Sequence, residues 1–180
     1  TDHQAADTLR EVLATDLPVL VDADGLTLLS RQPELVRGRH APTLLTPHAG
    51  EFARLTGRRP EPDRVTAVRA LAADWGVHVL LKGRSTLIAN PAGHVFVNEA
   101  GGSWAATAGA GDVLSGMIGA LMSAGMAPDL AAAAGARAHA FAADTAARGG
   151  VDGAGAPTSA SAILDRVPTA VRRLRGMAES

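Results

Sequence analysis

Short apolar runs alternate with longer amphipathic stretches along the first half of the chain. The runs in PVLVDAD, APTLLT and VHVLLKG are compact and rich in Val and Leu. They predict buried strands at residues 19–21 and 43–46 and from residue 77 up to Lys82. Two further runs, STLIAN and HVFVN, are joined by the turn residues PAG and predict a hairpin.

Helical periodicity occupies the segments around these runs. An opening helix has apolar residues at Leu9, Val12 and Leu13 and ends before Pro18. The segment EPDRVTAVRALAADWG predicts the clearest helix, with proline in its entry and Gly76 after its end. A broken helix is expected in GLTLLSRQPELV, and a second helix after Pro47 and through Leu55, with Gly57 beyond its end. Three more are expected at about residues 113–124, 129–147 and 159–175, the last interrupted at Pro168.

This order of elements predicts an α/β domain with a mostly parallel central sheet, flanking helices and one β-hairpin. Residues 1–180 suffice for one compact domain and not comfortably for two. Three strong parallel strands are few for a sheet covered on both faces, and the opening helix leads directly into a core strand. We therefore expect a single domain that lacks its N-terminal part.

Composition narrows the classes of function. Hydrophobic residues make up 47% of the chain, enough for a full core, whereas aromatic residues make up only 3%, too few for a surface that stacks bases. Seventeen basic and eighteen acidic residues leave a formal charge of -1, which attracts neither nucleic acid nor an anionic membrane. Cysteine is absent, which excludes disulfides and thiolate chemistry. With no signal-peptide pattern, we expect a soluble, cytoplasmic protein.

The stretch TAGAGDVLSG places Asp112 at the start of an apolar helix, after a run of tiny residues. Free N–H groups and the helix dipole favour an anion there, and Gly109, Ala110 and Gly111 leave the backbone open to a phosphate. A carboxylate repels a phosphate, so Asp112 suits a general base that deprotonates a hydroxyl as it attacks phosphorus. The alternative is that Asp112 only caps the helix.

Two other stretches follow predicted strands, where open α/β sheets bind ligands. In LLKGRST, Lys82 can balance the charge of a phosphate or be an ordinary turn lysine. In TPHAGE, His48 can donate to a ligand and Glu51 can lie near a metal, or the histidine is a satisfied loop residue. Asp22 and Asp24, in VDADG, lie at another strand end and are explained equally well by a turn with a helix cap and by a metal site. None of these has the spacing of a metal-binding motif, so no metal ligands are assigned.

Four stretches together, VDADGLTLL, LLTPHAGEFARL, VLLKGRSTLIA and NEAGGSWAATAGAGDVLSGMIGAL, resemble the ADP- or ATP-dependent NAD(P)H-hydrate dehydratases in order and spacing. The resemblance runs from about residue 17 to APTSASAI and implies a ribokinase-like fold. It also implies repair of the S-epimer of hydrated NADH or NADPH, in which water has added to the ring at C6. ADP, or ATP, would phosphorylate the C6 hydroxyl with Mg²⁺ present, and loss of phosphate would restore the cofactor and leave AMP, or ADP.

The resemblance also implies roles for single residues. Asp112 would be the base and contact the hydrate, which His48 would also contact. Gly109 and Ala110 remain candidates for an anion hole. Nucleotide contacts would come from Lys82, Gly83, Arg84, Ser85, Thr86 and Gly111. We expect small-molecule partners, no nucleic acid and no membrane, and a homo-oligomer is left open.

The chain departs from the family pattern at three positions. Ala108 and Ala110 replace a glycine and a hydroxyl residue of the loop, which removes one phosphate donor, and Thr27 replaces an asparagine. One alternative is a small-molecule kinase of the hydroxyethylthiazole or hydroxymethylpyrimidine type, which would use the same loop and base. Another is a nucleotide-binding fragment without activity.

Overall fold

The computed structural model describes residues 2–99, 102–149 and 154–178, in which five strands form one sheet. The strands lie in chain order: β1 (Val19–Val21), β2 (Thr43–Leu45), β3 (His78–Leu81), β4 (Ser85–Ala89) and β5 (Val95–Glu99). β1, β2 and β3 pair in parallel, whereas β3–β4 and β4–β5 pair antiparallel, so the sheet is mixed. Only residues 82–84 connect β3 to β4, and so short a connection reverses the chain because a parallel pair needs a crossover. The predicted parallel strands and the hairpin are confirmed.

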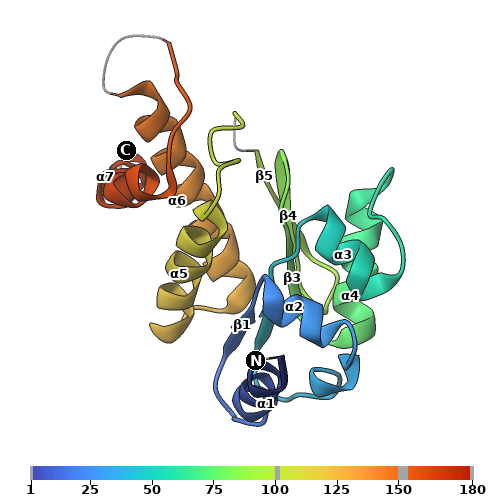
Figure 1. Cartoon of the computed structure of the whole chain (residues 1–180). Coiled ribbons are helices and arrows are strands. Elements are labelled where there is room, and N and C mark those ends of the chain that lie inside the picture. The colour runs from blue at the N-terminus through green and yellow to red at the C-terminus, as the bar shows by residue number, and fades with distance from the viewer. Residues whose placement is uncertain (1, 100–101, 150–153, 179–180) are drawn as a thin grey trace.

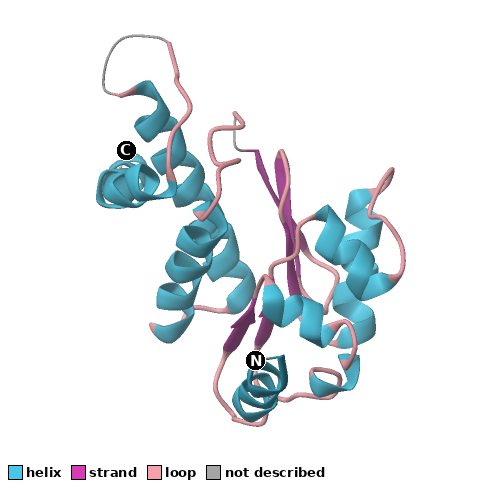
Figure 2. Cartoon of the chain, viewed as in Figure 1, coloured by secondary structure: helices cyan, strands magenta, loops and turns pink. Residues whose placement is uncertain are grey.

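Helices cover both faces of the sheet (Figures 1 and 2). One face carries the helices of the first half of the chain, and α5 and α6 pack on the other, with α7 against α6. None of the described helices has the length and apolar character needed to cross a membrane. The helices are α1 (Asp2–Leu13), α2 (Asp24–Leu29), the 3-10 turn η1 (Pro33–Leu35), α3 (Ala49–Thr56), α4 (Arg64–Trp75), α5 (Ala110–Ser123), α6 (Pro128–Arg148) and α7 (Ala160–Ala178).

Strand alternation builds two separate cores. Leu44, Leu80 and Ile88 point from successive strands into the core under α5 and α6. Their neighbours along the strands, such as Val79 and Leu81, point into the core under α2, α3 and α4. Both sets are almost completely buried, as expected for strands covered on both faces.

The helix ends follow the sequence signals in most places. The Asp63 side chain accepts a hydrogen bond from the backbone N–H of Thr66 and caps α4. Gly57 and Gly76 end α3 and α4 in the left-handed conformation that glycine adopts without a steric penalty. These helix ends therefore agree with the predicted positions.

Two predictions about the later helices are wrong. α5 begins at Ala110 and not at residue 113, because Gly109 supplies the left-handed turn directly before it. α7 is not interrupted at Pro168, although proline removes one backbone donor within it. Ile163 and Ala170, on either side of Pro168, are buried in a core shared with α6, and this packing holds the helix together across the proline.

Candidate active site

The site lies where the parallel strands end. Asp22 follows β1, His48 lies three residues after β2, and Lys82 follows β3. Backbone hydrogen bonds continue the sheet past these ends, from Thr46 N to Val21 O (3.1 Å) and from Lys82 N to Pro47 O (2.8 Å). The three side chains are therefore brought to one edge of the sheet, as strand-end placement predicts.

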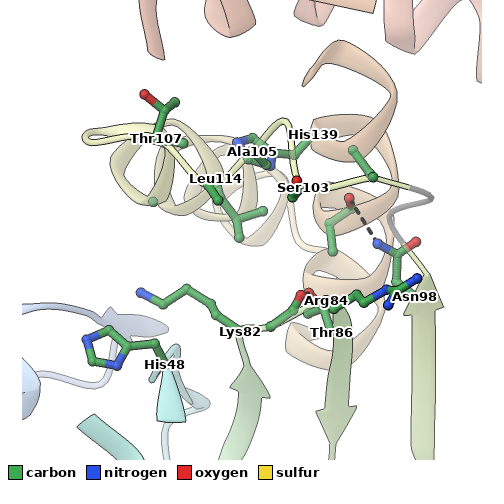
Figure 3. A pocket seen from close by; sticks show the side chains of 17 residues that line it. His48, Lys82, Arg84, Thr86, Asn98, Ser103, Ala105, Thr107, Leu114 and His139 are labelled. Carbon is green, nitrogen blue, oxygen red and sulfur yellow. Dashed lines mark hydrogen bonds between the residues drawn. The ribbon is translucent and has the colours of Figure 1, made fainter. Parts of the chain in front are cut away.

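A cavity with a volume of about 810 Å³ opens between this edge and the helices α5 and α6 (Figure 3). The view shows Lys82 and His48 on the strand side, with Leu114 and His139 on the helix side. Of the residues singled out in the sequence, those that line the cavity are His48, Lys82, Gly83, Arg84, Thr86, Ala110 and Gly111. Ser85, Gly109 and Asp112 are not among the lining residues, although each directly adjoins one of them in the chain.

Lys82 is held by carboxylates. Its Nζ lies 2.7 Å from Asp22 Oδ1 and 3.7 Å from Glu51 Oε2. Asp22 also accepts hydrogen bonds from Ser115 Oγ (2.8 Å) and from the backbone N–H of Ala23 (2.9 Å). Burial alone would raise the pKa of Asp22, but the hydrogen bond and charge of Lys82, with the bonds from Ser115 and Ala23, lower it below its usual value. The carboxylate and the ammonium therefore form a charged pair, and Lys82 is not an ordinary turn lysine.

His48 caps α3. Its Nδ1 accepts hydrogen bonds from the backbone N–H groups of Gly50 (2.9 Å) and Glu51 (3.2 Å), and Glu51 Oε2 accepts one from His48 N (2.8 Å). Because Nδ1 is an acceptor, the neutral ring carries its hydrogen on Nε2, 3.5 Å from Glu51 Oε1. The side chain is 52% exposed and lines the cavity, so this N–H remains accessible to a ligand.

Arg64, at the start of α4, supports the turn between β3 and β4. Its guanidinium donates to Ser85 O (2.9 Å) and Lys82 O (3.3 Å). A Cβ on Gly83 would come within 2.6 Å of Arg64 Nη2, so a larger residue there would displace the guanidinium from its present position. The hydrogen bonds from Arg64 therefore stabilise the turn that presents Lys82, Arg84 and Thr86 to the cavity.

Asp112 lies in the first turn of α5, whose N-cap is Gly109. The Asp112 side chain is exposed, and in the described part of the chain no hydrogen bond or ion pair engages its carboxylate. The helix-cap alternative is therefore wrong, because no capping bond is made. The preceding residue, Gly111, lies close to the strand-end cluster: a Cβ there would be 3.8 Å from Lys82 Nζ and 3.9 Å from Asp22 Oδ2.

Comparison with known proteins decides the family. A model of the NAD(P)H-hydrate dehydratase family matches residues 1–166. The chain belongs to this family. The bifunctional NAD(P)H-hydrate repair enzyme Nnr of Mycobacterium leprae is 57% identical over 173 residues, which are 96% of this chain and 36% of that protein. The ADP-dependent (S)-NAD(P)H-hydrate dehydratase of Neisseria meningitidis is 45% identical over 152 residues, covering 80% of this chain and 51% of that one.

Solved structures agree with this membership. The ADP/ATP-dependent NAD(P)H-hydrate dehydratase from Bacillus subtilis, co-crystallized with ATP/Mg²⁺, superposes with a TM-score of 0.72 at 30% identity. A ribokinase-like superfamily protein from Enterococcus faecalis superposes with a TM-score of 0.75 at 25% identity. The matches cover 95% and 96% of this chain but only 59% and 60% of those chains. The fold is ribokinase-like, as expected, and the chain spans only part of the length of its dehydratase relatives.

Several residues at or beside this cavity were not identified from the sequence. Asp22 was left open, and nothing local distinguished Arg64, Ser115 or Asn98, which lines the cavity and donates to Ala136 O (3.3 Å). His139 lines the cavity from α6 and is only 6% exposed. Burial lowers its pKa, partly offset by the Ala110 backbone, and its Nε2 has no hydrogen-bond partner among the described residues. These residues come from segments far apart in the chain, so only the fold reveals them.

Proposed function

We propose that this chain carries the ADP- or ATP-dependent dehydration of hydrated NADH and NADPH, with ADP as the expected phosphoryl donor. The observation that carries the proposal is the shared cavity. It is lined by His48, by Ala110 and Gly111 at the amino end of α5, and by four residues of the proposed nucleotide-binding stretch, Lys82, Gly83, Arg84 and Thr86. The names of the Neisseria and Bacillus relatives support the same reaction.

In the proposed reaction, the Asp112 carboxylate takes the proton of the C6 hydroxyl as that oxygen bonds to phosphorus. The bond from this phosphorus to the bridging oxygen breaks, and AMP leaves, or ADP where ATP is the donor. The C6–O bond then breaks, phosphate leaves, and the neighbouring carbon gives up a proton to restore the reduced ring. The free N–H groups of Gly109 and Gly111 stabilise the phosphoryl oxygens. The N–H of Ala110 donates to Thr107 O (3.2 Å), so Ala110 would join this anion hole only by giving up that bond. Nε2–H of His48 donates to the hydrated cofactor.

The charges at the strand ends fit a magnesium nucleotide. Asp22 and Glu51 place two carboxylates within 4 Å of the ammonium of Lys82, so its charge is already balanced before a polyphosphate binds. Among the described residues no group of three or more His, Asp or Glu side chains is arranged to hold a metal ion alone. This suits Mg²⁺, which binds one or two carboxylates together with phosphates and water. Glu51 would hold it, since its Oε1 has only the long contact to His48, and the ion would neutralise phosphate charge.

The test of the base is Asp112→Asn. We expect turnover of hydrated NADH to be lost while ADP affinity stays within a few-fold, because Asp112 acts on the hydroxyl and not on the nucleotide. Turnover is followed by the returning absorbance of the reduced nicotinamide, and ADP affinity by calorimetry. The matched control, Asp165→Asn on the exposed surface of α7, should behave as wild type. Equal turnover in Asp112→Asn would remove this residue as the base.

The product separates repair from the kinase alternative. A kinase of the hydroxyethylthiazole or hydroxymethylpyrimidine type would leave a stable phosphoester, whereas the dehydratase releases inorganic phosphate in step with restored cofactor. The dehydratase and repair names of the relatives favour the second outcome. A chain that binds ADP but restores no cofactor would support the fragment without activity.

The setting of the reaction is also part of the proposal. We infer a cytoplasmic protein whose partners are small molecules, since the near-neutral formal charge of -1 provides no general attraction for nucleic acid or anionic lipid. Residues 1–180 act as a single dehydratase domain, and self-association into a homo-oligomer is testable by light scattering.

A further inference from the structure

Asp22 connects three segments that meet only in the folded protein. Its Oδ1 accepts from Lys82 Nζ (2.7 Å), which lies 60 residues further along, and its Oδ2 accepts from Ser115 Oγ (2.8 Å), 93 residues further along. The side chain is only 12% exposed, and every hydrogen bond it makes is to a different donor group. One carboxylate thus ties the end of β1 to the end of β3 and to α5.

The backbone after Asp22 is strained in a way that serves this arrangement. Ala23 has φ 49° and ψ -119° and is the only non-glycine residue with positive φ in the described part of the chain. Its N–H donates to Asp22 Oδ1 (2.9 Å). A Cβ on Gly25 would come within 2.9 Å of Val21 Cγ1, which shows how tightly the chain turns here. Strain of this kind persists where the surrounding structure requires a particular geometry, and it collects at functional sites.

Ser115 sets the rotation of α5 about its own axis. Gly111 and Ser115 are four residues apart and therefore lie on one face of the helix, which faces Asp22 and Lys82. Asp112 is one residue further round the same first turn and is exposed. The hydrogen bond from Ser115 to Asp22 therefore ties the face of α5 next to Asp112 to the strand ends.

We propose that Asp22 is a positioning residue that keeps two parts of the site in register. Through Oδ1 it holds Lys82 of the nucleotide-binding turn, and through Oδ2 and Ser115 it aims the first turn of α5, which carries the base. The inference rests on the proposed function for its catalytic half. Asp22 itself touches neither reacting group in this scheme, because its oxygens are taken by Lys82, Ala23 and Ser115.

Ser115→Ala separates the two halves, because it removes the bond to α5 and leaves Lys82 paired with Asp22. We expect kcat to fall on the order of tenfold or more, as small misplacements of a base do, with KM for ADP nearly unchanged. Ser115→Thr keeps the hydroxyl and should recover most of kcat. Ser123→Ala, at the exposed end of the same helix, is the matched control. An unchanged kcat in Ser115→Ala, or a Thr variant as slow as the Ala variant, would overturn the role of Ser115.

The contact between Asp22 and Lys82 can be tested by a measurement that does not depend on catalysis. Lys82 is the only lysine of the chain, so an amine-selective reagent labels this side chain and the N-terminus alone. In Asp22→Asn we expect faster labelling of Lys82, because the amine leaves its partner more easily. Affinity for ADP with Mg²⁺ should be about tenfold weaker, because Lys82 is no longer held in position at the turn. Unchanged labelling and affinity in Asp22→Asn would refute this half. A wild-type chain without dehydratase activity would count against the proposed function, while labelling and ADP binding would still decide whether Asp22 holds Lys82.

Discussion

The two faces of the sheet are packed in different ways. Under α2, α3 and α4 the core contains large side chains, among them Phe52, Leu71 and Trp75. Under α5 and α6 the residues that α6 contributes to the core are small, Ala131, Ala132 and Ala136, and Gly135 packs closely against Ile118 of α5. The cavity opens on this second side, where small residues leave space between the helices and the strand ends. One face therefore stabilises the domain, and the other shapes the site while also contributing to stability.

Core truncations should expose this division most strongly. Leu71→Ala in α4 and Ile118→Ala in α5 each remove a buried side chain and should each lower the free energy of unfolding by about 2–5 kcal/mol. We expect only Ile118→Ala to reduce kcat of the folded protein as well, because α5 carries Asp112. Urea unfolding and assays well below the melting temperature measure the two effects. Equal loss of kcat in both variants would refute the division between the two faces.

Overpacking should have the next largest effect, at the contact between α5 and α6. A Cβ on Gly135 would lie 2.6 Å from Ile118 Cγ1, so Gly135→Ala should cost about 1–3 kcal/mol. The double variant Gly135→Ala with Ile118→Val should regain part of that loss. The control is Gly119→Ala, where a Cβ meets no atom within 4 Å and the helix should gain up to about 1 kcal/mol. Thermal unfolding of the four proteins gives the comparison, and a neutral Gly135→Ala would show that the helices can separate freely.

Most of the scaffold could be predicted from the sequence because its signals are local. Buried strands appear as short Val- and Leu-rich runs, and the ends of α3 and α4 are marked by Gly57 and Gly76. The predictions for the later helices were less accurate, because the start of α5 depends on the conformation of Gly109 and the continuity of α7 depends on its packing against α6. Local signals identify elements, whereas tertiary contacts decide where some of them begin and end.

The features of the site likewise divide into those that local sequence predicts and those that depend on tertiary contacts. The placement of Lys82 and His48 at strand ends, with the glycine-rich start of α5, followed from local pattern, and the structure brings these residues to one cavity. The pairing of Lys82 with Asp22, and of Asp22 with Ser115, joins residues with no periodic relation in the chain. Nothing in the sequence distinguishes His139 within its alanine-rich helix, because its burial beside the cavity depends on how α6 packs on the sheet.

The smallest predicted effect is a pH dependence on the α5 and α6 side. Burial lowers the pKa of His139 and also that of His78, although the charge of Asp129 in α6 partly offsets the effect on His78. In the native protein both rings therefore stay neutral at pH values somewhat below 6.5, the usual pKa of histidine. The unfolded chain binds protons there that the native chain does not, so the free energy of unfolding should fall as pH drops below about 6.5 and be level above it. The lowered pKa of Asp22 acts in a separate range, since its contribution is present above 3.8 and is lost as pH falls further. Urea titrations at several pH values give the slope of the unfolding free energy against pH. This slope should be shallower in His139→Gln and almost zero when His78→Gln is added. An unaltered slope in the double variant would show that other groups cause the loss of stability in acid.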